Sequence, residues 1–343
     1  MPSTRESFVD MFVAGAGPAG ATIARLLARR GRRVWLVDPG TRRVDRLEIL
    51  APAACRVVEA LGIAHLLDDA SIARPCPGIR RRWGSARIEN DDFLRRPGGR
   101  GFVIDRAPFD ETLRRMAADA GVTCVTGRVV AARREGEAVV GKIESGSKEL
   151  GISAGLVIDA TGRPSAVARR MGARRLVSER LVAERQQAGA SPHTSGPDAA
   201  WLDVEGNRGG WSYAVSGPGE RRDRWTIYAP GQRPHVRSST RADASSVLLS
   251  RAAGDGWIAI GDAAASFDPV TSQGLVNALS TALVAAGAIL SPGGLDREAR
   301  AIYSDAVAAT FRYSEAGRAG VYAALARGGK QPVGSRGVHV TRS

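Results

Sequence analysis

Short apolar runs, each followed by a glycine or a carboxylate, set the pattern of the first forty residues. Residues 8–14 are mostly apolar and as long as a buried parallel strand, and residues 21–30 have the pattern of a helix that Gly31 ends. Residues 34–37 form a second apolar run, which ends at Asp38. This order of strand, turn, helix and strand predicts an α/β fold.

The same kinds of element return later in the chain. Apolar runs at 156–158 and 257–260 predict further buried strands, and a long apolar stretch at 273–290 predicts a helix with Thr271 or Ser272 as its N-cap. We also expect a helix at 108–120, strands at 201–204, 211–215 and 225–228, loops at 189–198 and 230–244, an amphipathic stretch at 297–327, and a polar tail from Gly328.

Net charge and composition exclude several classes of protein. The 343-residue chain has a formal charge of +14, and arginine supplies nearly all of its 49 basic side chains. These arginines spread along the whole chain instead of clustering on one element, so the pattern favours acidic cofactors or partners and no nucleic acid. No apolar run reaches the roughly 18 residues that a membrane helix needs, so we expect no stable membrane insertion.

Cysteine and histidine positions argue against a metal site. Cys55, Cys76 and Cys124 show no paired spacing, which predicts reduced, mostly buried thiols in a cytoplasmic protein. The four histidines are scattered, so the sequence supports neither a zinc cluster nor a Ser–His triad.

A glycine motif follows the first predicted strand. Gly15 permits a tight turn, Gly17 lets backbone amides approach a pyrophosphate, and Gly20 lets the helix pack closely on the strand. The helix N-terminus then directs free N–H groups at the phosphates. Asp38 ends the second strand, where a carboxylate can accept hydrogen bonds from ribose hydroxyls. Ala16, Pro18 and Ala19 complete the turn, which by itself does not separate NAD from FAD.

A second motif chooses between these cofactors. The apolar run at 257–260 delivers Gly261 and Asp262 to the carboxyl end of a strand, the usual ligand edge of an α/β sheet. There Asp262 can hold a ribityl hydroxyl. The helix that begins near Gln273 and Gly274 can point its N-terminal amides at the N1/C2 carbonyl edge of a flavin, with Gly274 allowing close backbone approach.

Four motifs in one order make the chain resemble a flavoprotein family. They are Gly-Pro-Ala-Gly at 17–20, Asp-Arg-x-x-Phe-Asp at 105–110, Asp-Ala-Thr-Gly at 159–162 and Gly-Asp-Ala-Ala at 261–264. The chain resembles the group of p-hydroxybenzoate-hydroxylase-type monooxygenases, geranylgeranyl reductases and flavin-dependent tryptophan halogenases. Trp83-Gly84 and the stretch from Asp268-Pro269 to Gln273-Gly274 make it most similar to the halogenase-like flavoproteins that mature tryptophan-derived quinone cofactors.

The resemblance implies FAD as cofactor and further site residues. Arg106 matches an arginine that lies along the cofactor, although a surface pair with Asp110 is the alternative. The backbone of Val129 matches a contact to adenine, Pro269 a position beside the isoalloxazine ring, and Thr161 the second crossing of the FAD domain, where its role is cofactor contact or structural support.

The same resemblance implies a domain plan within the α/β class. It gives a Rossmann-like FAD-binding domain in two parts, with an inserted β-rich substrate lobe and C-terminal helices. The parts are residues 6–170 and 251–327 for the FAD-binding domain, 171–250 for the substrate lobe, and 328–343 for a loose tail.

The leading functional prediction is a monooxygenase that hydroxylates an aromatic substrate through a flavin C4a-hydroperoxide. The substrate is then a small aromatic molecule or a tryptophan side chain in a partner polypeptide, and NAD(P)H or a separate flavin reductase supplies electrons. No side chain identifies itself as the acid or base.

The resemblance leaves three alternatives to a monooxygenase, and the substrate lobe is shorter than is usual in the family. A flavin-linked C=C reductase and a non-catalytic FAD-binding protein both remain open. A halogenase is disfavoured, because residues 31–141 contain no lysine and the stretch 211–216 lacks the second tryptophan of the halogenase motif. Trp83, Trp201, Trp211 and Trp225 either stack on substrate or pack the core, and core packing is favoured.

Overall fold

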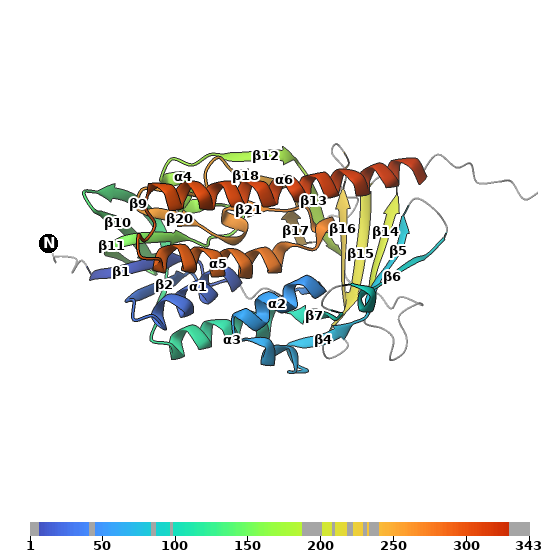
Figure 1. Ribbon diagram of the computed structural model, residues 1–343, viewed down its shortest axis with the longest axis horizontal. Coiled ribbons are helices and arrows are strands. Elements are labelled where there is room, and N and C mark those ends of the chain that lie inside the picture. Colours follow the sequence, from blue (N-terminus) through green and yellow to red (C-terminus); the bar gives the residue numbers. More distant parts are fainter. Residues whose placement is uncertain are drawn as a thin grey trace, which may run out of the picture.

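The computed structural model describes residues 7–40, 45–83, 87–96, 99–186, 201–207, 210–217, 222–228, 232 and 240–328. The predicted loop at 189–198 and the predicted tail beyond Gly328 lie outside these ranges. Figure 1 shows an elongated molecule with one sheet and its helices on the N-terminal side and a second sheet at the opposite end.

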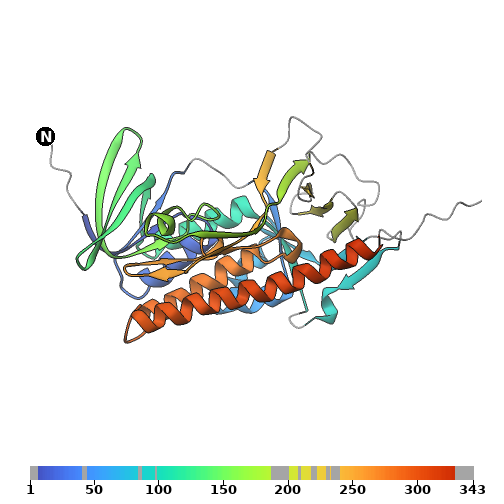
Figure 2. The same ribbon diagram turned by 90° about the horizontal axis from the view of Figure 1, so that it is seen from above.

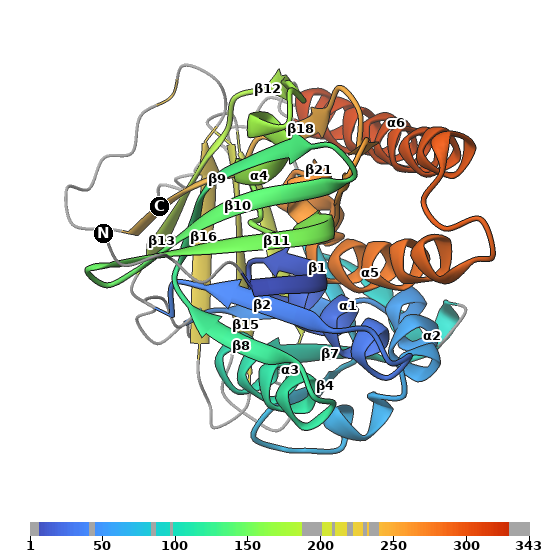
Figure 3. The ribbon, with the colours of Figure 1, turned by 90° about the vertical axis from the view of Figure 1, so that its left-hand side faces the viewer.

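A parallel sheet forms the centre of the N-terminal side (Figure 3). Its strands follow the order β20, β11, β1, β2 and β8. The nearly continuous apolar sequence of β1 reflects this central position, which buries both faces of the strand. One edge is extended by β19, and β9 and β10 join β11 in an antiparallel meander. The bounds are β1 (Ser7–Ala14), β2 (Val34–Asp38), β8 (Thr123–Thr126), β9 (Arg128–Glu135), β10 (Ala138–Ser145), β11 (Lys148–Asp159), β19 (Ala253–Gly254) and β20 (Trp257–Ala259).

Helices α1 and α5 pack against each other beside this sheet (Figure 3), and α3 packs on α1. In α5 the buried apolar side chains recur at helical spacing, with Leu275, Leu279, Ala282 and Ile289 on the buried face. The bounds are α1 (Pro18–Ala28), α2 (Pro52–Ala60), α3 (Arg106–Asp119), α4 (Ala166–Arg170), α5 (Gly274–Leu290) and α6 (Arg297–Gly328).

The second sheet follows the order β17, β13, β16, β15, β14, β5 and β6. Its strands are antiparallel except that β14 pairs with β5 in parallel. Two of these strands, β5 and β6, come from the N-terminal part of the chain. The bounds are β5 (Gly78–Trp83), β6 (Glu89–Asp92), β13 (Val182–Gln186), β14 (Leu202–Asn207), β15 (Gly210–Ser216), β16 (Arg222–Tyr228) and β17 (Thr240–Asp243).

Two small antiparallel sheets join the two ends of the molecule, in the orders β3-β7-β4 and β12-β18-β21. Their bounds are β3 (Leu47–Leu50), β4 (Ala73–Cys76), β7 (Gly101–Asp105), β12 (Arg175–Glu179), β18 (Ser246–Leu249) and β21 (Ala265–Ser266).

Three predictions about local structure need correction. The predicted loop at 230–244 is wrong at its end, because residues 240–243 form β17 against β13. Neither Thr271 nor Ser272 is the N-cap of α5, which is Gln273. The thiols are free, but only Cys76 is buried; Cys55 is partly buried and Cys124 is exposed.

Helix α6 runs along the molecule from the central sheet to the second sheet (Figures 1 and 2). It packs on β19 at one end of its course and on β5 at the other, and it passes β18, β21 and the turn at Pro269–Thr271 on the way. Among the described residues, no helix is both long and apolar enough to cross a lipid bilayer.

Candidate functional site

The glycine turn between β1 and α1 has three glycines in three different environments. A β-carbon on Gly15, whose φ is +103°, would lie 2.3 Å from the carbonyl oxygen of Ala160. One on Gly20 would lie 1.8 Å from the carbonyl oxygen of Gly15. A β-carbon on Gly17 would meet no atom within 4 Å. Gly15 and Gly20 are therefore required by protein packing, whereas Gly17 leaves open space beside the backbone for a ligand.

The first turn of α1 is suited to a phosphate group. Pro18 is at its start, no side chain caps the helix, and no acidic residue lies in the first turn. The first amides of an α-helix have no acceptor within the helix, so they are available to an anion.

Asp38 lies at the end of β2, beside this turn. Its carboxylate accepts hydrogen bonds from the amides of Ala16 and Gly40, both at 2.9 Å. Each oxygen of a carboxylate has a further lone pair, so Asp38 braces the turn and can still accept from a ribose. The amide of Gly127 donates to the carbonyl oxygen of Asp38 at 2.8 Å, which places the start of β9, with Val129, close to the end of β2.

The late motif lies directly against the glycine turn. A β-carbon on Gly261 would lie 3.0 Å from the β-carbon of Ala19 in α1 and 3.5 Å from the Cα of Ala278 in α5. The amide of Gly261 donates to the hydroxyl of Thr281 at 2.7 Å. Gly261 therefore lies between the two helices, and the absence of a side chain lets them approach.

Asp262 follows at the carboxyl end of β20. Its side chain is 31% exposed, so part of the carboxylate is accessible. Burial raises the pKa of Asp262, and the guanidinium groups of Arg163 and Arg46 oppose that rise. The Nε atom of Arg163 lies 3.7 Å from an Asp262 carboxylate oxygen.

Arg163 is a residue that the sequence argument did not select. Its guanidinium donates to the carbonyl oxygens of Ser245 at 2.6 Å and Phe267 at 2.8 Å. It thereby ties the segment after β11 to the segment after Asp262. The sequence feature that could have revealed Arg163 is its position directly after the Asp-Ala-Thr-Gly motif.

That motif is used for support within the protein. Asp159 accepts hydrogen bonds from the amide and hydroxyl of Thr161 and from the amides of Val167 and Ala168, at 2.6 to 2.9 Å. Asp159 therefore ties the first turn of α4 to the end of β11. The Cα of Thr161 also lies 3.2 Å from the β-carbon position of Gly15, so the motif forms one wall of the glycine turn.

The start of α5 is a second uncapped helix N-terminus. Its N-cap, Gln273, makes no side-chain capping hydrogen bond, and its buried Oε1 atom has no hydrogen-bond partner among the described residues. Ser272 has a left-handed backbone conformation, and Pro269 opens the short 3₁₀ turn before it. An orphaned buried acceptor beside free amides fits a ligand that carries both donors and acceptors, such as a flavin ring.

A charged cluster lies against this helix start. Arg106 is 6% exposed and donates to Asp110 at 2.8 and 3.0 Å, and it also pairs with Glu48. The alternative prediction was a surface ion pair of Arg106 with Asp110. Asp110 is indeed a partner of Arg106, but the pair is buried. Glu48 also accepts from Arg46 at 3.2 Å, and its Oε1 atom is 2.9 Å from the β-carbon position of Gly274.

Arg46 and Glu48 are two more residues that the sequence argument missed. Burial opposes ionisation of Glu48, but Arg106 and Arg46 outweigh it and lower the pKa of this carboxyl. Glu48 lies against Gly274 at the start of α5, and Gly261, the neighbour of Asp262, lies against Ala278 one turn later, so the charged cluster and Asp262 flank the same end of this helix. The sequence feature that could have revealed Glu48 is its charge inside the otherwise apolar strand β3.

An aromatic face of the second sheet lies next to this cluster. Trp83 and Trp211 both register with Gly206 of the strand between them, and their ring centroids are 6.2 Å apart because Gly206 has no side chain. Tyr213 lies 5.8 Å from Trp211 and directly opposite Trp225. We call Trp83, Trp211, Tyr213 and Trp225 the aromatic face.

Two observations connect the aromatic face to the site. The amide of Leu47, which lies between Arg46 and Glu48, donates to the carboxylate of Asp223 at 3.2 Å, and Asp223 is two residues before Trp225 in β16. Trp225 is 8% exposed, and its buried indole N–H has no hydrogen-bond partner among the described residues. The aromatic face therefore borders the charged cluster and carries an unused donor.

Together these features define the class of the protein. A glycine turn at the carboxyl edge of a parallel sheet, two uncapped helix N-termini and a partly open carboxylate form a dinucleotide site of the FAD type. Residues 9–230 match the family described as FAD binding domain, and the chain belongs to that family. It is an FAD-dependent oxidoreductase, as the four motifs indicated, and the predicted α/β fold with a Rossmann-like core is confirmed.

Two curated relatives cover most of the chain. The chain is 29% identical to 6-methylpretetramide 4-monooxygenase of Streptomyces rimosus, over 91% of this chain and 82% of that protein. It is 30% identical to digeranylgeranylglycerophospholipid reductase of Methanoculleus marisnigri, over 81% of this chain and 75% of that protein. Both lie within the group that the sequence motifs resemble.

Two solved structures share the fold. The flavin-dependent brominase Bmp2 superposes with a TM-score of 0.79 at 19% identity, over 94% of this chain and 89% of that chain. The peptidyl tryptophan dihydroxylase QhpG superposes with a TM-score of 0.72 at 22% identity, over 96% of this chain and 77% of that chain. At these identities the likeness concerns the fold.

Proposed function

We propose that this FAD-dependent enzyme is a monooxygenase that hydroxylates an aromatic substrate. The observation that carries the proposal is the aromatic face beside the charged cluster: the amide of Leu47, between Arg46 and Glu48, donates to Asp223 at 3.2 Å, and Trp225 lies two residues further along the same strand. The relation to a named monooxygenase over 91% of the chain supports it.

The chain's own residues would hold the cofactor and keep water away. The turn at 15–20 would bind the pyrophosphate, Asp38 the ribose, Asp262 the ribityl chain, and the start of α5 at Gln273 and Gly274 the ring edge. Arg106 and Val129 would border the adenosine and ring regions as the family motif implies. FAD supplies the redox chemistry with oxygen when it is bound.

Trp211 and Trp225 are buried in the core of the second sheet, as core packing predicts, so Trp83 and Tyr213, the half-buried members of the aromatic face, would stack on the substrate, and the Trp225 indole N–H would donate one hydrogen bond to it. A substrate that accepts this hydrogen bond satisfies a buried donor that otherwise has no partner. We propose either a small aromatic molecule or a tryptophan-containing polypeptide, reached through the lobe at 171–250. Electrons would come from NAD(P)H or a separate flavin reductase, and the free thiols suit the cytoplasm.

Isotope incorporation tests the reaction. The FAD-loaded protein, with a reductant and a panel of phenols and indoles, is supplied with labelled oxygen gas, and products are analysed by mass spectrometry. The proposal predicts one labelled oxygen atom in an aromatic product. Reductant consumption with hydrogen peroxide as the sole product across the panel would contradict it.

A flavin-linked C=C reductase is the second candidate. The 30% identity to the archaeal lipid reductase favours it. The same assay separates the two, because a reductase turns over a polyprenyl substrate without oxygen and a monooxygenase does not.

A further inference from the structure

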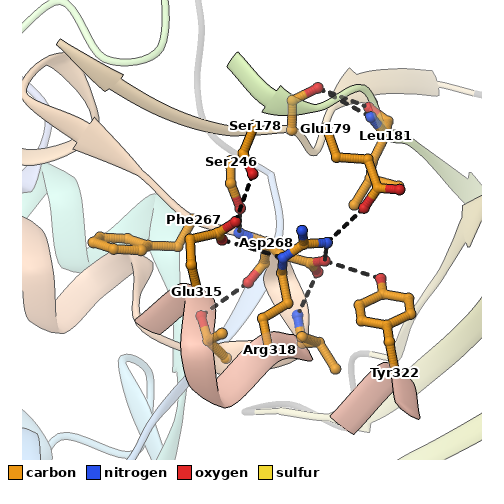
Figure 4. A network of polar contacts seen from close by, with 12 residues as sticks. Ser178, Glu179, Leu181, Ser246, Phe267, Asp268, Glu315, Arg318 and Tyr322 are labelled. Atoms are coloured by element: carbon orange, nitrogen blue, oxygen red, sulfur yellow. Dashed lines mark hydrogen bonds and ion pairs between the residues drawn. The ribbon is translucent and has the colours of Figure 1, made fainter. Parts of the chain in front are cut away.

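Two residues of helix α6 contact Asp268, which lies in the segment that leads into α5. This residue is 1% exposed and lies between β21 and the turn that precedes α5. One carboxylate oxygen accepts from the amide of Val270 at 2.9 Å. The other accepts from the hydroxyl of Tyr322 in α6 at 2.9 Å and lies 3.7 Å from a guanidinium nitrogen of Arg318 (Figure 4).

Tyr322 also contacts the aromatic face. The indole N–H of Trp211 donates to the Tyr322 hydroxyl at 2.9 Å, and that hydroxyl donates onward to Asp268. The hydroxyl therefore connects a strand of the second sheet with the segment that leads into α5. No other side chain among the described residues makes hydrogen bonds to both Trp211 and Asp268.

Arg318 holds this arrangement in place. It donates to Glu179 at 2.6 Å, lies 3.1 Å from Glu315, and its guanidinium carbon is 5.5 Å from the centre of the Tyr322 ring (Figure 4). Burial raises the pKa of Asp268, and the hydrogen bonds from Val270 and Tyr322 and the charge of Arg318 oppose that rise. A buried carboxylate with these donors has little freedom to move.

The segment after Asp268 leads into the start of α5, where the proposed site holds the ring edge of the cofactor. Pro269 follows directly, and Gln273, with its orphaned buried oxygen, caps α5 four residues later. Arg163 fixes the same segment on its other side through the carbonyl oxygen of Phe267. A shift of Asp268 would therefore move the uncapped N-terminus of α5 relative to the ring.

We propose that Tyr322 is a positioning residue for the flavin: with Arg318 it fixes Asp268, and so sets the distance between the α5 N-terminus and the flavin ring. The partial positive charge of that helix end stabilises the reduced ring, which carries more negative charge than the oxidised ring. Loss of the Tyr322 hydroxyl therefore lowers the reduction potential of the bound FAD. This inference needs FAD binding and is independent of the reaction under Proposed function.

The test compares Tyr322→Phe with Tyr313→Phe in the full-length, FAD-loaded protein. Tyr313 is a matched control because it lies on the same helix and is 80% exposed. The expected result for Tyr322→Phe is a roughly tenfold loss of preference for reduced over oxidised FAD, which is a two-electron potential lower by about 30 mV. The flavin absorption spectrum shifts in the same variant, and Tyr313→Phe behaves as wild type.

Trp211→Phe supplies a second variant in case Tyr322→Phe folds poorly. It removes the donor to the Tyr322 hydroxyl and leaves the bond to Asp268, so it shifts the potential in the same direction by a smaller amount. The inference is overturned if both variants keep the wild-type potential and spectrum. It is also overturned if they lower thermal stability alone, because Tyr322 then only supports the fold.

Discussion

The methyl group of Ala19, in the first turn of α1, lies against Gly261 at the end of β20: a β-carbon on Gly261 would be 3.0 Å from it. The early glycine turn and the late carboxylate motif are therefore neighbours in space. One extended cofactor can contact both, with its pyrophosphate at α1 and its flavin half at Asp262.

Alanine at Gly17 is expected to weaken FAD binding, whereas alanine at Gly20 is expected to prevent folding. Gly17→Ala folds normally, because its β-carbon meets no protein atom within 4 Å, but that β-carbon enters the pyrophosphate space. We expect FAD affinity to fall by about tenfold or more, which is about 1.4 kcal/mol. Gly20→Ala forces a contact with the Gly15 carbonyl and yields little folded protein. Thermal melts of the apo proteins and FAD titrations check both; wild-type affinity in Gly17→Ala would refute the assignment.

Arg163→Met removes the link between three segments of the site. It deletes the hydrogen bonds to Ser245 and Phe267 and the charge beside Asp262. We expect destabilisation of about 2 kcal/mol and a lower affinity for FAD, measured by denaturant unfolding and by fluorescence titration. Arg30→Met, at an exposed position, is the control. Equal behaviour of the two variants would show that Arg163 does not support the site.

Glu48→Gln should change the pH dependence of stability. The ion pairs with Arg106 and Arg46 lower the pKa of Glu48 in the folded protein below its unfolded value. Their contribution is therefore complete well above the unfolded pKa of about 4 and is lost as the pH falls through the folded pKa.

The measurement is the free energy of unfolding of wild type and Glu48→Gln between neutral and acidic pH. We expect the difference in free energy of unfolding between the two proteins to be largest near neutral pH and to disappear on acidification. Glu205→Gln removes an exposed ion pair with Arg82, so its free energy of unfolding should stay within about 0.5 kcal/mol of the wild-type value over the whole pH range. A gap for Glu48→Gln that widens in acid would contradict the ionised, paired state.

Trp225→Phe tests the aromatic face. Trp225 is buried, so the smaller ring lowers stability, but loss of the indole N–H costs no hydrogen bond, because it has no partner among the described residues. If the substrate accepts that hydrogen bond, KM rises by about tenfold while FAD affinity is unchanged. Trp201→Phe, at a half-buried position 5.9 Å from Arg80, is the matched control. A KM change shared by both variants would remove Trp225 from the substrate site.

The sequence predicts the parts of the fold that depend on neighbouring residues. The run at 8–14, the helix after the glycine turn and the strand that ends at Asp38 each carry their signal locally, and the structure has them as β1, α1 and β2. The helix at 273–290 is present as α5, but its N-cap is predicted wrongly, because Thr271 and Ser272 are good N-caps by residue type. The 3₁₀ turn and the left-handed Ser272 use those residues before the helix begins.

Long-range contacts could not be predicted in this way. The parallel pairing of β5 with β14 joins segments more than a hundred residues apart, and nothing in either strand specifies the other. Arg46, Arg163 and Arg318 were missed because the chain is rich in arginine, and only burial and partners separate these three from surface arginines. Tyr322 lies in a helix whose amphipathic pattern gives no hint of a bond to Asp268.

The central claim is that one FAD molecule contacts both the glycine turn and Asp262. Titration of FAD and of ADP into the wild type, Gly17→Ala and Asp262→Ala tests it most directly. We expect the wild type to bind one FAD, Gly17→Ala to weaken both ligands, and Asp262→Ala to weaken FAD while leaving ADP unchanged. A wild-type protein that binds no FAD, or an Asp262→Ala variant with undiminished FAD affinity, would contradict the account.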